Sequence, residues 1–231
     1  MFIKPDYRLT RRLPFNLICA VLIFVAASQA AVADELAVWN FNDSNLNVDR
    51  GNGTLTSNLI VSNILFAAGT TNNARQGDIA GQALSLQGGT GTANNGRNLT
   101  FNVSTLGFSN IVVSFATQGT STGFNSNQFQ YSLDGITFID FGPPYVPLSA
   151  FGTVPVVFTL SSIVGLNNNA NAAFRIVFNG ATSSTGTNRI DNFVVEGTSS
   201  PVPDSAVPEP MTALLLLTGL GGLYKYKRIR R

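Results

Sequence analysis

Residues 129–141 read Phe-Gln-Tyr-Ser-Leu-Asp-Gly-Ile-Thr-Phe-Ile-Asp-Phe, and this stretch decides the fold class. Apolar and polar residues alternate on both sides of Asp134-Gly135, which is the period of a half-buried β-strand. An Asp-Gly pair between two such runs is typical of a two-residue type I′ turn, whose central residues need positive φ. The sequence therefore predicts an antiparallel β-hairpin with Asp134 and Gly135 at its turn.

Short apolar runs of the same kind recur through residues 34–198, separated by polar, glycine-rich segments. We expect further strands at 36–41, 59–66, 83–87, 99–103, 111–116, 156–160, 174–178 and 190–195. The run at 111–116 is more continuously apolar than the others, which predicts a central strand, and no segment shows a convincing amphipathic helix. About nine or ten short strands joined by long polar loops predict an all-β fold, a jelly-roll-like antiparallel β-sandwich.

The N-terminus has the three parts of a secretory signal peptide. Four cations precede an apolar run at 13–27, and small residues follow as Ala-Val-Ala at 31–33. This order predicts a signal peptide over residues 1–33, with Ala31 and Ala33 at the cleavage site and a mature start at Asp34; cleavage after Ala30 is the second choice. The secretory translocon and signal peptidase are the partners that this segment predicts.

The C-terminus combines a proline motif, an apolar run and a basic end. The motif is Val207-Pro208-Glu209-Pro210, the run covers 211–224, and the cations are Lys225, Lys227, Arg228, Arg230 and Arg231. As a helix the run would measure about 21 Å at ~1.5 Å per residue, short of a hydrocarbon core of about 30 Å. The sequence predicts a short transmembrane helix whose basic end stays in the cytoplasm and whose proline motif is extended outside.

In this order, the three parts of residues 207–231 resemble the sorting signal of PEP-CTERM proteins, found in exopolysaccharide-producing Gram-negative bacteria. The resemblance covers about a tenth of the chain. It implies an exosortase as partner, passage through the inner membrane, removal or exchange of the tail, and a final place at the cell surface or in the extracellular matrix. The alternative is a membrane anchor that is never cut. Residues 199–206 are rich in Ser and Pro and predict an extended spacer before the signal.

The charge of the delivered part differs from that of the whole chain. Nine of the fourteen Lys and Arg residues lie in the two targeting segments, so residues 34–210 carry five arginines against eleven acids, a net charge of −6. An acidic domain without lysine is unsuited to nucleic-acid binding. The chain has no histidine, and its only cysteine, Cys19, lies in the signal peptide. Ser-His-Asp triads, cysteine nucleophiles and the usual zinc sites are therefore excluded from the domain.

Two segments resemble those of secreted jelly rolls. The Gln-Tyr-Ser-Leu-Asp-Gly run at 130–135 with Phe138 is similar to a hairpin of galactose-binding-like and carbohydrate-binding modules, and Ile-Asp-Asn-Phe-Val-Val at 190–195 to a closing strand. Jelly rolls often hold structural calcium between first and last strands, which makes Asp191, Asn42 and Asp43 candidate ligands, because calcium prefers oxygen. The alternative is that Asp191 hydrogen-bonds the backbone.

The remaining candidates concern sugars. Tyr145 follows two prolines in a loop and is the candidate exposed ring for a sugar contact, while Trp39 lies in an apolar strand and is expected in the core. Asp134, Asp140 and Glu196 are the only acids placed for a glycosidase. We expect a non-catalytic, structural or adhesive protein linked to exopolysaccharide or biofilm. The alternative is a carbohydrate-binding module for the matrix polysaccharide, and the third reading is a glycoside hydrolase or lyase.

Overall fold

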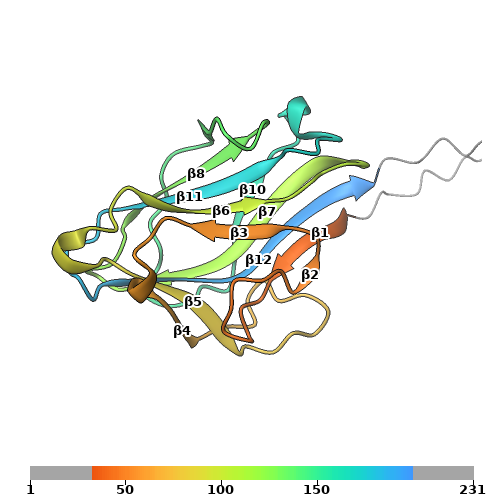
Figure 1. Cartoon of the computed structure of the whole chain (residues 1–231). Helices are drawn as coiled ribbons and strands as arrows, with labels where there is room; N and C mark the ends of the chain where they lie inside the picture. The colour runs from red at the N-terminus through yellow and green to blue at the C-terminus, as the bar shows by residue number, and fades with distance from the viewer. Residues whose placement is uncertain (1–32, 200–231) are drawn as a thin grey trace, which may run out of the picture. The chain divides into compact units, whose positions relative to one another are not determined.

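The computed structural model describes residues 33–199, and these residues form two antiparallel β-sheets packed face to face (Figure 1). The seven-stranded sheet contains β1 (Ala33–Trp39), β2 (Arg50–Gly51), β4 (Ile64–Ala68), β5 (Gln82–Gln87), β7 (Phe108–Gly119), β10 (Val156–Thr159) and β12 (Thr187–Ser199). The five-stranded sheet contains β3 (Thr54–Ser57), β6 (Arg97–Asn102), β8 (Ser126–Ser132), β9 (Ile139–Asp140) and β11 (Ala173–Asn179). The predicted all-β antiparallel sandwich is confirmed, with twelve strands in the described residues in place of nine or ten.

Most neighbouring strands are distant in the sequence. The seven-stranded sheet has the order β10-β7-β12-β1-β2, with β5 beside the first half of β12 and β4 beyond β5. The five-stranded sheet has the order β3-β6-β11-β8-β9. The first strand pairs with the last, Ala33 opposite Thr198, and β7 lies between β10 and β12, which confirms its predicted central place.

Aromatic rings from both sheets fill the space between them. Phe101 of β6 stacks on Phe193 of β12 with centroids 3.5 Å apart, and Phe129 of β8 stacks on Phe158 of β10 at 3.9 Å. Trp39 is fully buried and meets Phe101 edge-on at 5.1 Å, so its predicted place in the core is confirmed. Truncating such a ring to alanine typically costs about 3–5 kcal/mol.

The predicted hairpin forms, but the predicted turn is wrong. Gln130 pairs with Asp140, so the residues between β8 and β9 form a six-residue connection, and Gly135 but not Asp134 has positive φ. The Asp134 carboxylate accepts hydrogen bonds from the backbone N–H groups of Ile136 and Thr137, at 2.8 and 2.7 Å. A side-chain oxygen that binds the backbone two or three residues on builds a wider turn than a type I′ pair.

The single strand predicted at 59–66 is also wrong. A 3₁₀ turn, η1 (Val61–Asn63), breaks this run, and only its end belongs to β4, which begins at Ile64. The other helical turns are η2 (Thr90–Thr92) and η3 (Val164–Leu166). Within residues 33–199 no helix is both long and apolar enough to cross a membrane. The predicted signal helix and C-terminal transmembrane helix fall outside the described residues.

Candidate functional site

The loop at 69–81 lies over β12 and the middle of β7 on the outer face of the seven-stranded sheet. Two consecutive side chains of β12 hold this loop: Asp191 accepts from the Thr70 N–H at 2.7 Å, and Asn192 Nδ2 donates to the carbonyls of Thr70 and Asn72 at 2.8 and 2.9 Å. Asn192 forms a bulge in β12 with φ of 49°, a backbone conformation that asparagine tolerates better than most residues. The polar pair inside the apolar 190–195 run therefore serves to anchor the loop.

Ion pairs fix the same loop at its far end. Arg75 lies 2.9 Å from Glu196 of β12, and Asp78 lies 2.8 Å from Arg50 of β2, which also contacts Glu35 at 3.3 Å. Partly exposed pairs of this kind contribute up to about 1 kcal/mol each. Together with Asn192 they hold the loop against the sheet.

The candidate calcium ligands are already occupied by N–H donors. Both Asp191 oxygens accept backbone hydrogen bonds, from Thr70 and Asn192, and the Asn42 Oδ1 accepts one from Gln82 at 2.9 Å. Asp43 is exposed and accepts from the Asn45 side chain. Within residues 33–199 no three His, Cys, Asp or Glu side chains form a group that could hold a metal. The backbone hydrogen bonds account for Asp191, and calcium stays a prediction.

The outer face of the five-stranded sheet is different, because a row of polar side chains crosses it. The strand register places one residue from each strand opposite the next, and we call this set the polar row: Thr56, Thr100, Arg175, Gln130 and Asp140. In β11 the residues flanking Arg175 are fully buried, so the row lies on the side of the sheet away from the core. Four strand spacings of about 4.8 Å give the row a length of about 19 Å.

An aromatic ring lies over the middle of the row. The Arg175 guanidinium carbon is 3.3 Å from the centroid of the Phe138 ring, and Phe138 belongs to the connection between β8 and β9. Phe138 is half-buried and, unlike most aromatic residues of the domain, is not part of the core. A guanidinium over an aromatic face is an attractive cation–π arrangement, which fixes the ring over the sheet.

The row offers hydrogen-bond donors and acceptors side by side. Arg175 Nε donates to Thr100 Oγ1 at 3.0 Å, and Gln130 Nε2 donates to Asp140 Oδ1 at 2.8 Å. These contacts leave the terminal guanidinium nitrogens of Arg175, the Gln130 carbonyl and the second Asp140 oxygen for other partners. Groups of both kinds along one line suit a ligand rich in hydroxyl groups.

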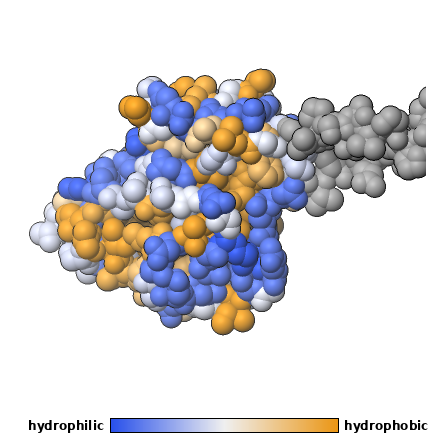
Figure 2. Space-filling view, turned by 45° about the vertical axis from the view of Figure 1, so that its right-hand side comes forward, coloured by the Kyte–Doolittle hydropathy of each residue, from blue (hydrophilic) through white to orange (hydrophobic). Residues whose placement is uncertain are grey.

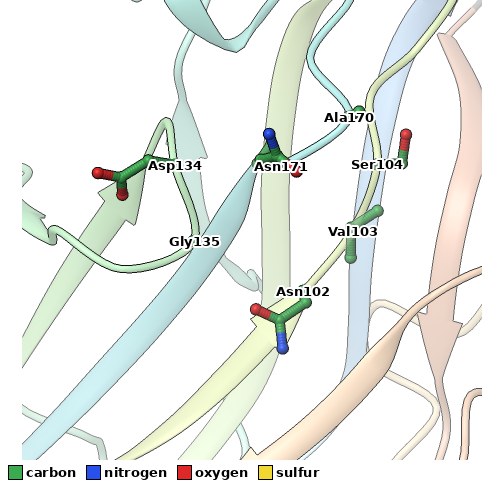
Figure 3. A pocket seen from close by; sticks show the side chains of 8 residues that line it. Asn102, Val103, Ser104, Asp134, Gly135, Ala170 and Asn171 are labelled. Atoms are coloured by element: carbon green, nitrogen blue, oxygen red, sulfur yellow. The ribbon is translucent and has the colours of Figure 1, made fainter.

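A shallow pocket of about 260 Å³ lies at one end of this face (Figure 3). The end of β6 supplies Asn102 to one side, the connection after β8 supplies Asp134, and Asn171 precedes β11 between them. The Asp134 carboxylate points away from Asn102 and Ser104 in this view. Asn102 pairs with Ala173, which lies two residues before Arg175 in β11, so the pocket adjoins the polar row.

The exposed hydrophobic side chains do not offer an aromatic platform. Every exposed large hydrophobic residue within 33–199 is aliphatic. Figure 2 shows hydrophobic residues at one end and across the middle of the visible side, among hydrophilic ones. The half-buried Phe138 is therefore the aromatic ring best placed to meet a ligand on the five-stranded sheet.

No protein-family model and no curated protein matches the chain. Among solved structures it is similar to TmCBM61 in complex with β-1,4-galactotriose, with 12% identity and a TM-score of 0.42 over 68% of this chain and 92% of that one. It is also similar to the CBM22-1 xylan-binding domain of Paenibacillus barcinonensis Xyn10C, with 10% identity and a TM-score of 0.44 over 74% and 99% of the two chains. A third similar structure is domain 4 of AbnA, a GH43 extracellular arabinanase from Geobacillus stearothermophilus, in complex with arabinotriose. The identity is 15% and the TM-score 0.43, over 72% of this chain and 94% of that one. The function of this chain has to be argued from its own residues.

Tyr145 is not the exposed platform that its place after two prolines suggests. Its backbone exchanges two hydrogen bonds with Asn127, and its ring packs 5.8 Å from Phe115 and 6.2 Å from Phe158. Its hydroxyl group is buried without a hydrogen-bond partner among the described residues, and this burial raises the pKa of the hydroxyl. The sugar contact predicted for Tyr145 would need this ring to leave its place against the core.

The acids considered for a glycosidase are dispersed. A glycosidase needs two carboxyl groups on either side of one bond, one of them protonated. Glu196 belongs to the seven-stranded sheet, whereas Asp134 and Asp140 belong to the five-stranded one. Hydrogen bonds from Thr137, Ile136 and Ser132 lower the pKa of Asp134, which keeps this carboxyl ionised and unsuited to be a general acid. That the protein is no enzyme stays a prediction.

The targeting residues are placed only in part. Ala33 is the first residue of β1 and pairs with Thr198, so cleavage after Ala33 would leave a strand that begins at Asp34. Ala31, the motif at 207–210 and the cations at 225–231 lie outside the described residues.

Sequence reasoning missed the polar row. The signal in the sequence was a polar residue at every second position of apolar strands, such as Arg175 between Phe174 and Ile176. That alternation places Arg175 on the outer face, but the strands that bring Thr100 and Gln130 beside it are far away in the chain.

Proposed function

We propose that residues 34–198 form a non-catalytic module that binds a polysaccharide chain on the outer face of the five-stranded sheet. The observation that carries this proposal is the polar row with Phe138 fixed over its centre by Arg175. Of the roles expected from the sequence, a carbohydrate-binding module is therefore the one that the geometry supports best.

The chemistry of the face fits a sugar chain. Hydroxyl groups both donate and accept, which matches the free guanidinium nitrogens of Arg175 and the free oxygens of Gln130 and Asp140. The apolar face of a sugar ring packs on an aromatic ring, a role that Phe138 can fill. The row is about 19 Å long, and its end residues, Thr56 and Asp140, are both exposed, so it would take an internal stretch of a polymer rather than a chain end.

Affinity electrophoresis of the full-length chain in detergent, through gels containing a panel of plant and bacterial polysaccharides, tests the proposal. We expect at least one polymer to slow the protein, and Arg175→Gln and Phe138→Ala each to remove the retardation. Arg189→Gln is the matched control, because Arg189 lies on the other sheet and bonds the Ala68 carbonyl. Equal migration in every gel, or equal retardation of all variants, would contradict the proposal.

We also propose that the module reaches its polymer by export and exosortase processing. The support is the signal peptide at 1–33 and the sorting signal at 207–231, read from the sequence. A polysaccharide-binding domain delivered to the cell surface or matrix would itself act as an adhesive or structural protein. The structural or adhesive role and the carbohydrate-binding role expected from the sequence would then be one function. Mass spectrometry of the extracellular protein should find a C-terminus near residues 207–210, and an intact Arg231 there would contradict processing.

A further inference from the structure

Charge on the binding face bears on the class of polysaccharide. Arg175 is the single cation of the polar row, and none of the salt bridges among the described residues includes it. Its Nε donates to Thr100, and its guanidinium stacks on the Phe138 ring. The terminal nitrogens remain as donors near the centre of the face.

Carboxylates lie on the same side of the domain. Asp140 is exposed at the β9 end of the row, and only one of its oxygens accepts the Gln130 amide. Asp134 is exposed at the pocket that adjoins the row. The face thus carries two negative groups for one positive group.

The rest of the domain adds to this negative field. Residues 33–199 contain nine acids and five arginines, and four of these arginines lie outside the polar row. Arg50 and Arg75 are paired with acids, while Arg97 and Arg189 bond backbone carbonyls. A ligand with repeated negative charge would approach against the summed potential of the domain.

We infer that the polysaccharide bound at this face is uncharged, and that its hydroxyl groups donate to Asp140 and accept from Arg175. The inference rests on the proposed function and names its ligand class. A hydroxyl group serves both residues, whereas a carboxylate gains at Arg175 and is repelled at Asp140. In a polyuronate every sugar carries a carboxylate, so a chain that crosses the row cannot keep its charges away from Asp140.

Matched polymers test this inference. The full-length chain in detergent is run by affinity electrophoresis against two pairs that share a backbone: hydroxyethylcellulose with carboxymethylcellulose, and carboxyl-reduced polygalacturonate with polygalacturonate. For the backbone that binds, we expect at least tenfold weaker binding of the charged member at low salt, and a smaller difference at 0.5 M salt because added ions screen exposed charges. Equal or tighter binding of the charged member at low salt would overturn the inference and leave the proposed function standing. Retention by neither pair and by no polymer of the wider panel would contradict the proposed function itself.

A substitution at Asp140 tests the residue responsible. Asp140→Asn keeps the oxygen that accepts from Gln130 and removes the charge, so affinity for the charged polymer should rise about two- to fivefold at low salt with little change for the neutral one. Asp34→Asn removes an exposed charge from β1 of the other sheet, and it should change neither affinity. If Asp140→Asn leaves the affinity for the charged polymer unchanged, Asp140 does not select against charge and the inference fails.

Discussion

The contact between Arg175 and Phe138 should be measurable as a coupling energy. Arg175→Gln removes the cation over the ring and weakens the bond to Thr100, which together should cost about 2 kcal/mol of stability, about half from each contact. Phe138→Ala removes the same cation–π contact and a half-buried ring, at a further cost of about 1–2 kcal/mol. Because both single variants lose the contact, the double variant should lose about 1 kcal/mol less than their sum.

Urea unfolding of the wild type, the two single variants and the double variant gives the four free energies of this cycle. A second cycle that pairs Phe138→Ala with Arg189→Gln is the control, since Arg189 lies on the other sheet, and it should be additive to about 0.5 kcal/mol. A coupling below about 0.3 kcal/mol in the first cycle would refute the stacking of Arg175 on Phe138. The ring would then not be held over the polar row, and the proposed binding face would lose its centre.

Three further perturbations test the loop, the metal and the core. Burial raises the pKa of Asp191 to about 7, so between about pH 4 and pH 7 the folded chain holds a proton that the unfolded chain has released. The free energy of unfolding should therefore fall as pH rises through this range. In urea titrations Asp191→Asn should lack this part of the pH dependence, and an unchanged dependence would argue against the raised pKa. If Asp191, Asn42 and Asp43 bind calcium, a chelator should lower the midpoint of thermal unfolding, and an unchanged midpoint counts against a site. Tyr145→Phe should raise stability by about 1–2 kcal/mol, because it removes a buried hydroxyl group that lacks a partner, whereas a loss would mean that the hydroxyl is bonded.

Alternation of apolar and polar residues made the strands predictable. Phe174 and Ile176 face the core while Arg175 faces out. The same period places Leu99 and Phe101 in the core and Thr100 on the opposite face, where it is buried beside Arg175. Local side-chain chemistry produced the errors. The prediction of a type I′ turn at Asp134-Gly135 considered only the backbone angles of the two residues. The Asp134 carboxylate accepts hydrogen bonds from the backbone N–H groups of Ile136 and Thr137, and these bonds build a wider turn.

The candidate face could not be predicted because it depends on pairing between distant strands. Thr100, Gln130 and Arg175 lie side by side only because β6, β11 and β8 are neighbours, and no local pattern encodes that order. Tyr145 shows the converse: two prolines predict an exposed loop, yet the bridge to Asn127 pulls the segment against the core. Strand register and β-bridges between distant segments therefore decide which polar and aromatic side chains lie on the surface and which in the core.

The topology also separates the attachment points of the domain from its candidate binding face. Both β1 and β12 belong to the seven-stranded sheet, and the 69–81 loop lies over β12 on its outer face. The polar row lies on the sheet that contains neither strand. Ser199 ends β12, so the predicted spacer begins at residue 200. If residues 200–206 are extended, they span at most about 25 Å at ~3.5 Å per residue, and an unprocessed chain would hold the domain close to the membrane. The open sheet could still meet a polymer there, because neither targeting segment leaves from it. Exosortase cleavage would then free the module from the membrane without altering the five-stranded sheet. Polysaccharide affinity measured before and after removal of the tail should therefore be equal.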